Sequence, residues 1–149
     1  MTIVEQINND IKQAMLAKEK DKLEALRAVK TAFAIALTSN DNKSELTDDK
    51  SIIILQKLVK QRLDAGEIYK NQNRDDLASV EFMQAKFIKN YLPEQLSENE
   101  IEDVVKKIIF ENNINSIKDM GKIMGIASKL LQGKADNKTV SEIIKKLLN

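Results

Sequence analysis

The chain has 149 residues, and 42% of them are hydrophobic, which is enough to bury a core in one or two small domains. Its 24 basic and 23 acidic residues leave a net charge of +1, so any affinity for nucleic acid has to come from local patches. The sequence contains no histidine and no cysteine, which excludes the usual neutral-pH base, thiol nucleophiles, disulfides and histidine- or cysteine-bound zinc.

The N-terminal residues do not have the pattern of a signal peptide. They lack the basic start and the apolar stretch of a signal peptide, and no segment approaches about 18 uninterrupted apolar residues. We therefore expect a cytoplasmic protein without a membrane partner. We also expect no metal and no cofactor.

Four helices are predicted in the first 93 residues, because glycine and proline are scarce and apolar residues recur with helical spacing. Their expected starts are Thr2 with Glu5, Asp21 with Glu24, Thr47, and Asn73 with Asp76. A polar stretch at residues 39–44 is expected to be a mobile loop before the third helix. The third and fourth helices are expected to form a long antiparallel hairpin. The side chains predicted to face inward include Ile7, Ile11, Ala14, Met15, Leu26, Val29, Phe33, Leu37, Ile52, Leu55, Val59, Leu63, Leu77, Val80, Phe87, Ile88 and Tyr91.

The only proline, Pro93, is predicted to end this part, because the residue before a proline is driven out of the helical conformation. Three further helices follow, with starts expected at Ser97, at Ser116 and at Asp136 or Asn137. The last but one is expected to carry Met120, Ile123, Met124, Ala127, Leu130 and Leu131 toward the core. The sequence thus predicts an all-α fold with an N-terminal four-helix domain, residues 1–93, and a C-terminal three-helix domain, residues 94–149.

Three of the four glycines fall near the C-terminus, at Gly121, Gly125 and Gly133. A glycine inside a helix costs roughly 0.5–1 kcal/mol relative to alanine, so Gly121 and Gly125 need an explanation. One explanation is internal packing, in which a neighbouring helix approaches the bare backbone and Gly133 is a left-handed C-terminal cap. The other is a ligand, because backbone N–H groups beside Lys122 and Lys134 suit a phosphate oxygen.

Charge is divided unevenly between the two halves of the C-terminal domain. Residues 94–112 contain six acidic and two basic residues, a net charge of −4, whereas residues 113–149 contain seven lysines and three acidic residues, a net charge of +4. The basic half therefore coincides with the glycines.

Several segments together resemble the YqeY-like family of small bacterial proteins, over essentially the whole chain. They are residues 8–15, Asn-Asn-Asp-Ile-Lys-Gln-Ala-Met; residues 26–30, Leu-Arg-Ala-Val-Lys; residues 60–62, Lys-Gln-Arg; residues 91–97, Tyr-Leu-Pro-Glu-Gln-Leu-Ser; and the glycine-lysine segment. The Tyr-Leu-Pro-x-Gln-Leu junction followed by the glycine-lysine segment is the most specific part of this resemblance.

That family is similar to the C-terminal tail of the B subunit of the glutamyl/aspartyl-tRNA amidotransferase, which converts misacylated tRNA to its amide form. In that enzyme the tail helps to hold tRNA and the active site lies in another domain. The resemblance therefore implies a noncatalytic, tRNA-associated accessory protein, with an amidotransferase or the aminoacyl-tRNA machinery as possible partners and no DNA partner. The residues that would contact RNA are Lys118, Gly121, Lys122, Gly125, Lys129, Gly133, Lys134 and Lys138.

Two other functions remain open on the sequence. One is a protein–protein adaptor that uses the groove of the long hairpin. The other is an amide-transferring component, a carbon–nitrogen ligase with glutamine as amido-N donor, against which the missing histidine and cysteine argue.

Some polar and aromatic residues also allow both a functional and a structural interpretation. A second basic face could be formed by Arg27, Lys30, Lys60 and Arg62, although surface ion pairing is the ordinary role of such residues. Base stacking is conceivable for Tyr69, Phe82, Phe87 and Tyr91, but their spacing favours the core. The acid pairs at residues 48–49, 75–76 and 102–103 are mostly expected at helix starts, where they favour the helix dipole, rather than in catalysis.

Overall fold

The computed structural model describes residues 1–39 and 45–149, and these residues form seven α-helices and one short 3-10 helix without any strand. The all-α prediction is confirmed. Contacts divide the chain into two compact units, Met1–Leu92 and Pro93–Asn149, which we call unit 1 and unit 2. Apart from Ser39, which ends a helix, the loop predicted at 39–44 lies outside the described residues.

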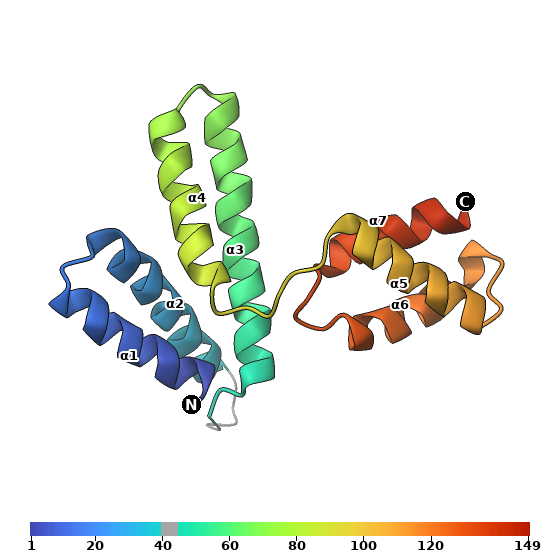
Figure 1. The fold of residues 1–149 in the computed structure, drawn as a ribbon, viewed down its shortest axis with the longest axis horizontal. Coiled ribbons are helices and arrows are strands. Elements are labelled where there is room, and N and C mark those ends of the chain that lie inside the picture. The colour runs from blue at the N-terminus through green and yellow to red at the C-terminus, as the bar shows by residue number, and fades with distance from the viewer. Residues whose placement is uncertain (40–44) are drawn as a thin grey trace. The chain divides into compact units, whose positions relative to one another are not determined.

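Unit 1 contains α1 (Ile3–Leu16), α2 (Lys20–Ser39), α3 (Asp48–Asn71) and α4 (Asp75–Lys89), as Figure 1 shows. The predicted capping box at the start of α1 is present, because Thr2 and Glu5 each accept a hydrogen bond from the other's backbone N–H. Thr47 caps α3 as predicted. The backbone N–H of Ile3 donates to the Asp48 carboxylate over 3.0 Å, which joins the starts of α1 and α3.

Two predicted helix starts in unit 1 are wrong. The second helix begins at Lys20, one residue before the expected Asp21. Asn73 does not cap α4, since it adopts a left-handed conformation with φ 60° and closes α3 instead. Its N–H donates to the Lys70 carbonyl over 3.1 Å, and the next N–H, that of Arg74, donates to the Tyr69 carbonyl over 2.9 Å. These are the two bonds of a Schellman motif, in which asparagine is a common substitute for glycine.

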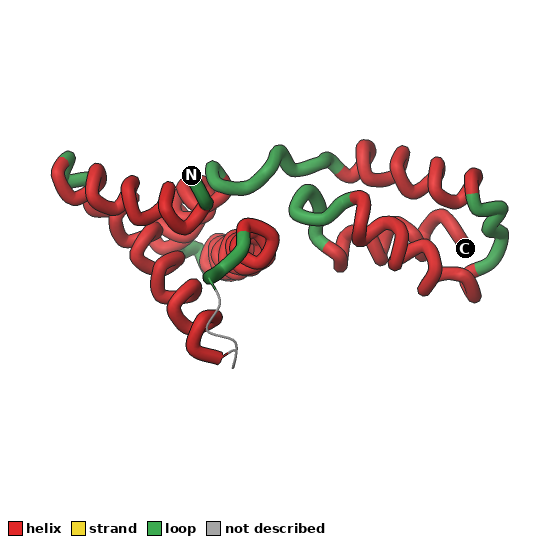
Figure 2. Tube along the Cα trace, turned by 90° about the horizontal axis from the view of Figure 1, so that it is seen from below, coloured by secondary structure: helices red, strands yellow, loops and turns green. Residues whose placement is uncertain are grey.

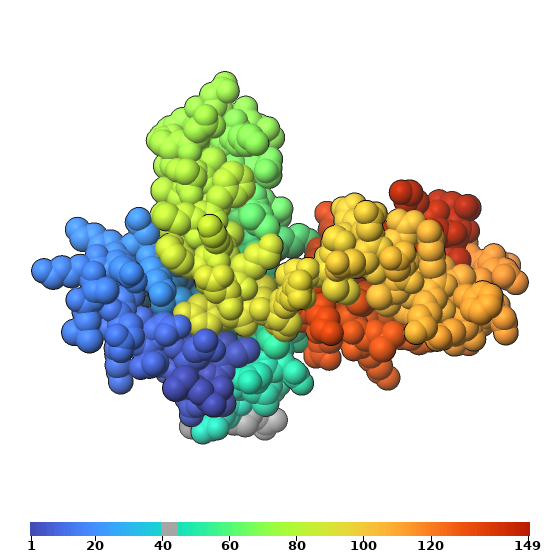
Figure 3. Space-filling model, in the orientation of Figure 1, coloured from blue at the N-terminus to red at the C-terminus, as the bar shows by residue number. Residues whose placement is uncertain are grey.

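The α3–α4 hairpin is the most extensively packed pair of helices in unit 1. In Figure 3 its tip, drawn in green, extends well beyond the blue α1–α2 pair. Gly66 of α3 is buried, and a Cβ atom at this position would lie 2.4 Å from Cε1 of Phe82 on α4. The absence of a side chain at Gly66 therefore lets the Phe82 ring lie directly against the backbone of α3.

The core of unit 1 lies where α1 and α2 meet the hairpin. It consists of Ile7, Ile11, Ala25, Leu26, Val29, Phe33, Leu46, Leu55, Val59, Ala85 and Ile88. Four side chains predicted to be buried in this unit are exposed instead: Met15, Leu37, Leu63 and Val80. For Leu63 and Val80 the reason is geometric, because a pair of helices that extends past its neighbours can bury only the sides that face each other.

Unit 2 packs α5 (Glu98–Glu111), the 3-10 helix η1 (Ile117–Asp119), α6 (Met120–Leu130) and α7 (Asn137–Leu148) around a separate core. The segment that leads from α4 to α5 is a loop, drawn in green in Figure 2. Ser97 and Glu100 form the predicted capping box of α5. The helix expected from Ser116 begins as η1 and becomes α-helical only at Met120. Leu130, which was expected in the core, is 59% exposed.

Candidate functional site

Gly121 and Gly125 lie on the exposed side of α6. A Cβ atom built on either glycine meets no described atom within 4 Å, apart from its own chain neighbours and helix backbone. Internal packing therefore does not explain these two glycines, and that interpretation is wrong for them. Close approach of another helix is instead allowed by Gly66, which no sequence pattern singles out.

Three lysines accompany the exposed glycines. Lys118 lies in η1, and Lys122 and Lys129 lie on α6. Lys122, Gly125 and Lys129 follow at steps of three and four residues, so they share one face of α6, opposite the buried Ile123 and Ala127. Lys118 precedes this face in the 3-10 helix. We call Lys118, Gly121, Lys122, Gly125 and Lys129 the glycine–lysine face. All five residues are exposed.

Gly133 belongs to the turn between α6 and α7. Its φ of 79° confirms the predicted left-handed cap, and the residue itself is buried. The side-chain amide of Gln95 donates to the Gly133 carbonyl over 2.7 Å and to the Pro93 carbonyl over 2.8 Å. The backbone N–H of Leu96 donates to the Lys134 carbonyl over 2.9 Å. The turn is thus fastened to the segment that precedes α5, while the Lys134 side chain stays exposed.

These hydrogen bonds, which we call the clamp, bring together two parts of the chain that are distant in the sequence. Gln95 and Leu96 belong to the Tyr-Leu-Pro-x-Gln-Leu junction, and Gly133 and Lys134 belong to the glycine-lysine segment. Both segments carry the family resemblance, but no sequence pattern gives Gln95 a role. The one sequence feature that points to Gln95 is its place in the Tyr-Leu-Pro-x-Gln-Leu junction. A contact between residues 38 positions apart produces no periodic pattern in the sequence.

The predicted contact residues therefore fall into two groups within unit 2. The glycine–lysine face forms one group, and Lys134 on the Gly133 turn with Lys138 in the first turn of α7 forms the other. All five lysines are exposed, and none forms an ion pair with another residue of 1–39 or 45–149. Their ammonium groups are therefore available to an external anion.

The second basic face suggested by the sequence is partly used inside unit 1. Nε of Arg62 donates to the Gln84 side chain over 3.1 Å, and Nη1 donates to the Leu58 carbonyl over 3.3 Å. Arg62 thus connects α3 with α4 rather than presenting a free cation. Arg27 and Lys30 are exposed on α2.

Three of the four aromatic residues considered for stacking serve the fold instead. Phe87 and Tyr91 pack against the core of unit 1, and Phe82 covers Gly66. The Tyr91 hydroxyl donates a hydrogen bond to the Asp10 carboxylate. Burial of the phenol, and then this contact with a negative charge, raise the pKa of Tyr91 above its ordinary value.

The acidic residues do not gather into a site. The pairs at 48–49 and 75–76 occupy the first turns of α3 and α4, as predicted. Arg74 donates two hydrogen bonds of 3.2 Å to Asp76, which lower the pKa of that carboxyl group. In the described part of the chain no three side chains come together in a way that could hold a metal ion. No helix in that part is long and apolar enough to cross a membrane.

The fold and this site define a class of small all-helical proteins with two units, of which the C-terminal one carries a glycine–lysine face. The chain belongs to the family described as Yqey-like protein, whose family model matches residues 4–148. The YqeY domain is the family that is similar to the C-terminal tail of the amidotransferase B subunit.

Several fungal proteins with one name are related to the chain. It is 28% identical over 149 residues to "Altered inheritance of mitochondria protein 41, mitochondrial" of Pyrenophora tritici-repentis, a match that covers 98% of this chain and 81% of the relative. The protein of that name from Clavispora lusitaniae is 31% identical over 108 residues, 72% of this chain and 61% of the relative. The one from Saccharomyces cerevisiae is 34% identical over 110 residues, 69% of this chain and 56% of the relative. The matches thus span from about half to four fifths of the relatives' length.

These relatives correct one prediction. They are named as mitochondrial proteins, which contradicts the expectation of a cytoplasmic protein. That expectation rested on the absence of a signal peptide, which says nothing about organelles reached by other routes.

Proposed function

We propose that this protein is a noncatalytic accessory protein that binds tRNA through the glycine–lysine face and the adjoining Lys134 and Lys138. The observation that carries the proposal is the pair of exposed glycines on α6. Gly121 and Gly125 weaken their helix, and no described residue packs against them. A position that costs stability without serving the fold indicates a surface that something else must approach closely.

The chemistry of this face suits a sugar-phosphate backbone. Because Gly121 and Gly125 have no side chains, the sugar-phosphate backbone of an RNA strand can lie directly against the surface of α6. The exposed Lys118, Lys122 and Lys129 can then reach its phosphates. Phosphate contacts position an RNA without reading its sequence. Such a face fits a protein that accompanies many tRNAs rather than one.

The Gly133 turn adds Lys134, a lysine on an ordered backbone, to this arrangement. Because Gln95 and Leu96 hold the carbonyls of Gly133 and Lys134, the backbone beneath the Lys134 side chain is ordered before any ligand binds. A preorganised site loses less conformational entropy on binding. The similarity of the family to a tRNA-holding tail further supports RNA as the ligand.

The proposal is tested by a binding titration of total tRNA at several salt concentrations. We expect Lys122→Ala with Lys134→Ala to lower the affinity and to flatten the salt slope by up to about one unit per lysine. Each phosphate contact that is lost means that about one counterion fewer is released on binding. Both side chains are exposed, so the helical circular dichroism spectrum should not change.

A matched control removes two exposed lysines from unit 1, by Lys12→Ala with Lys57→Ala. This variant has the same net charge as the first and should keep the wild-type slope. Equal slopes for all three proteins, or a wild type that does not bind tRNA even at low salt, would overturn the proposal. Duplex DNA serves as the second ligand and should bind more weakly.

A protein–protein adaptor is the second candidate function. It is favoured by the apolar side chains that the α3–α4 hairpin leaves in solvent, among them Leu63, Ile68 and Val80, which are 41%, 57% and 42% exposed. A partner protein that copurifies stably without RNA, and that is lost on Ile68→Ser, would support this function. The tRNA titration separates the two candidates, because an adaptor requires no salt-dependent RNA binding.

A further inference from the structure

Unit 2 contains a pocket of about 320 Å³ that the glycine–lysine face does not include. Its lining comes from α5, from the loop that follows α5 and from α7: Lys106, Ile109, Phe110, Asn113, Ile114, Asn115 and Leu147. This volume lies at the lower end of the range for small-molecule sites, which is about 300–1,000 Å³. The pocket therefore suits a ligand of one ring system rather than a large one.

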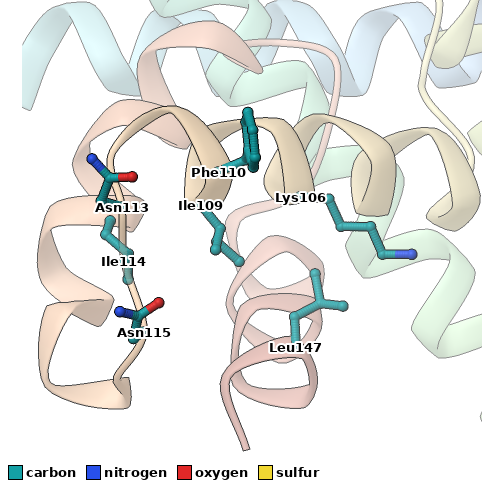
Figure 4. A pocket seen from close by; sticks show the side chains of 7 residues that line it. All are labelled: Lys106, Ile109, Phe110, Asn113, Ile114, Asn115 and Leu147. Carbon is teal, nitrogen blue, oxygen red and sulfur yellow. The ribbon is translucent and has the colours of Figure 1, made fainter.

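The lining separates polar from apolar groups. Figure 4 shows the side-chain amides of Asn113 and Asn115 at one end, Lys106 at the other, and Ile109 with Leu147 between them. An asparagine amide carries donors and an acceptor that can pair with the edge of a nucleobase. The apolar groups between the two ends suit the faces of a flat ring.

Phe110 is the least expected residue of this lining. Its side chain is 83% exposed and contributes to the lining of the pocket, and in Figure 4 it stands out from α5 on the side opposite to Ile109. Aromatic residues make up only 4% of the chain, and Phe82, Phe87 and Tyr91 serve the fold. An exposed aromatic face beside amide groups is the ordinary means of holding an unstacked base of single-stranded RNA.

The backbone of the lining is held in place by the end of α5. Asn113 adopts a left-handed conformation with φ 53°, and its N–H donates to the Phe110 carbonyl over 3.3 Å. The N–H of Ile114 donates to the Ile109 carbonyl over 3.1 Å, which completes a Schellman motif. This turn places the two asparagines beside the last turn of α5. Lys106 forms an ion pair of 3.1 Å with Glu102 at the surface. Because surface ion pairs contribute little free energy, Lys106 can leave Glu102 and contact a bound ligand.

From this arrangement we infer that the pocket binds one unpaired nucleobase of an RNA loop, stacked on Phe110 with its edge toward Asn113 and Asn115. The inference rests on the proposed function for its ligand class, because RNA is the source of the base. It goes beyond that function by adding a stacking contact to the phosphate contacts. Stacking neutralises no phosphate, so its contribution should not depend on salt.

The chain contains no tryptophan, so Phe110→Trp introduces a single fluorescent reporter at the site. Nucleoside monophosphates, a single-stranded oligonucleotide and tRNA should each change its emission. Ribose 5-phosphate, which has the same phosphate and sugar but no base, should not. An unchanged emission with every nucleotide, or an equal change with ribose 5-phosphate, overturns the inference.

A second measurement uses the natural side chain. Phe110→Ala should weaken tRNA binding by about five- to hundredfold at every salt concentration while the salt slope stays at the wild-type value. Phe110→Tyr keeps the aromatic face and should bind like the wild type. The high exposure of Phe110 makes a folding defect in either variant unexpected, which a thermal melt verifies.

The outcomes separate this inference from the proposed function. If tRNA binds with a lysine-dependent slope and Phe110→Ala has no effect, the nucleobase site is wrong and the proposed function stands. If nucleotides change the emission of the Phe110→Trp protein but tRNA binding does not depend on Lys122 and Lys134, the nucleobase site stands and the proposed phosphate face is wrong.

Discussion

Tyr91 joins the end of the last helix of unit 1 to its first helix. Its hydroxyl donates to Asp10 of α1, and its ring packs against the core. Ionisation would place a phenolate in a partly desolvated position next to a carboxylate. Burial and the adjacent charge therefore raise the pKa of Tyr91 above the ordinary 10.0 and favour the protonated form in the folded state.

This pKa shift predicts a loss of stability at alkaline pH. A group with a raised pKa in the folded state contributes its full stability below its unfolded pKa, here 10.0, and loses that contribution as the pH rises further. Tyr91→Phe should lower the free energy of unfolding by about 1 kcal/mol or less at neutral pH, through the lost hydrogen bond. It should also reduce the decline above pH 10. Urea unfolding over a pH series measures both effects, and parallel curves for the two proteins would contradict the assignment.

At the scale of the helix, glycine has two opposite roles in this chain. Gly66 of α3 is buried against the Phe82 ring, whereas Gly125 of α6 faces open space. Both interrupt a helix and carry the same intrinsic cost. Only the neighbouring helix distinguishes a glycine that the fold requires from one that it merely tolerates.

Substitution by alanine should separate the two roles. Gly66→Ala brings a methyl group to 2.4 Å from Phe82, and it should cost about 1–3 kcal/mol of stability through overpacking, offset by about 0.5–1 kcal/mol of helix propensity. Gly125→Ala meets nothing within 4 Å and should stabilise the protein by about 0.5–1 kcal/mol. Thermal or urea unfolding of the two variants gives the comparison. A destabilised Gly125→Ala protein would show that its surroundings are not open.

The same helix allows stability to be separated from binding. A leucine side chain in Gly125→Leu projects into solvent, so the melting temperature should not fall. It would nevertheless occupy the place proposed for the RNA backbone, and tRNA affinity should decrease. An unchanged affinity would remove Gly125 from the proposed contact surface.

At the scale of the whole molecule, each unit has a hydrophobic core of its own. The Gln95 and Leu96 hydrogen bonds attach the start of unit 2 to its Gly133 turn. Limited proteolysis should therefore cut preferentially before Gln95 rather than after it. A fragment that begins at Pro93 retains this clamp, and one that begins at Ser97 does not.

Comparison of the two fragments tests this organisation. Fragment 93–149 should unfold cooperatively by itself, because domains of about 60 residues can fold alone. Fragment 97–149 should be less stable by about 1–3 kcal/mol, since it lacks the hydrogen bonds to the Gly133 and Lys134 carbonyls. Circular dichroism melts of both fragments give the difference. Identical melts would mean that the clamp contributes nothing to unit 2.

Features that depend on neighbours along the chain could be predicted from the amino-acid sequence alone. The capping boxes at Thr2 and Ser97 and the left-handed Gly133 were predictable, because a cap is made by residues only three or four positions apart. Helical periodicity likewise predicted the all-α class, and the junction and glycine-lysine segments predicted the family.

Which helix covers which face could not be predicted in this way and is known from the three-dimensional packing. Periodicity marks a side chain as apolar on one side of a helix, but burial requires another helix to lie there. Val80 has the spacing of a buried residue, but no helix covers it. Gly66 belongs to no apolar pattern, yet the Phe82 ring lies against it. Phe110 is apolar but lies outside the buried stripe of α5. Gln95 reaches Gly133 across 38 residues of chain. Contacts between distant segments leave no local signal in the sequence, and the attachment of Gln95 to the Gly133 turn is such a contact.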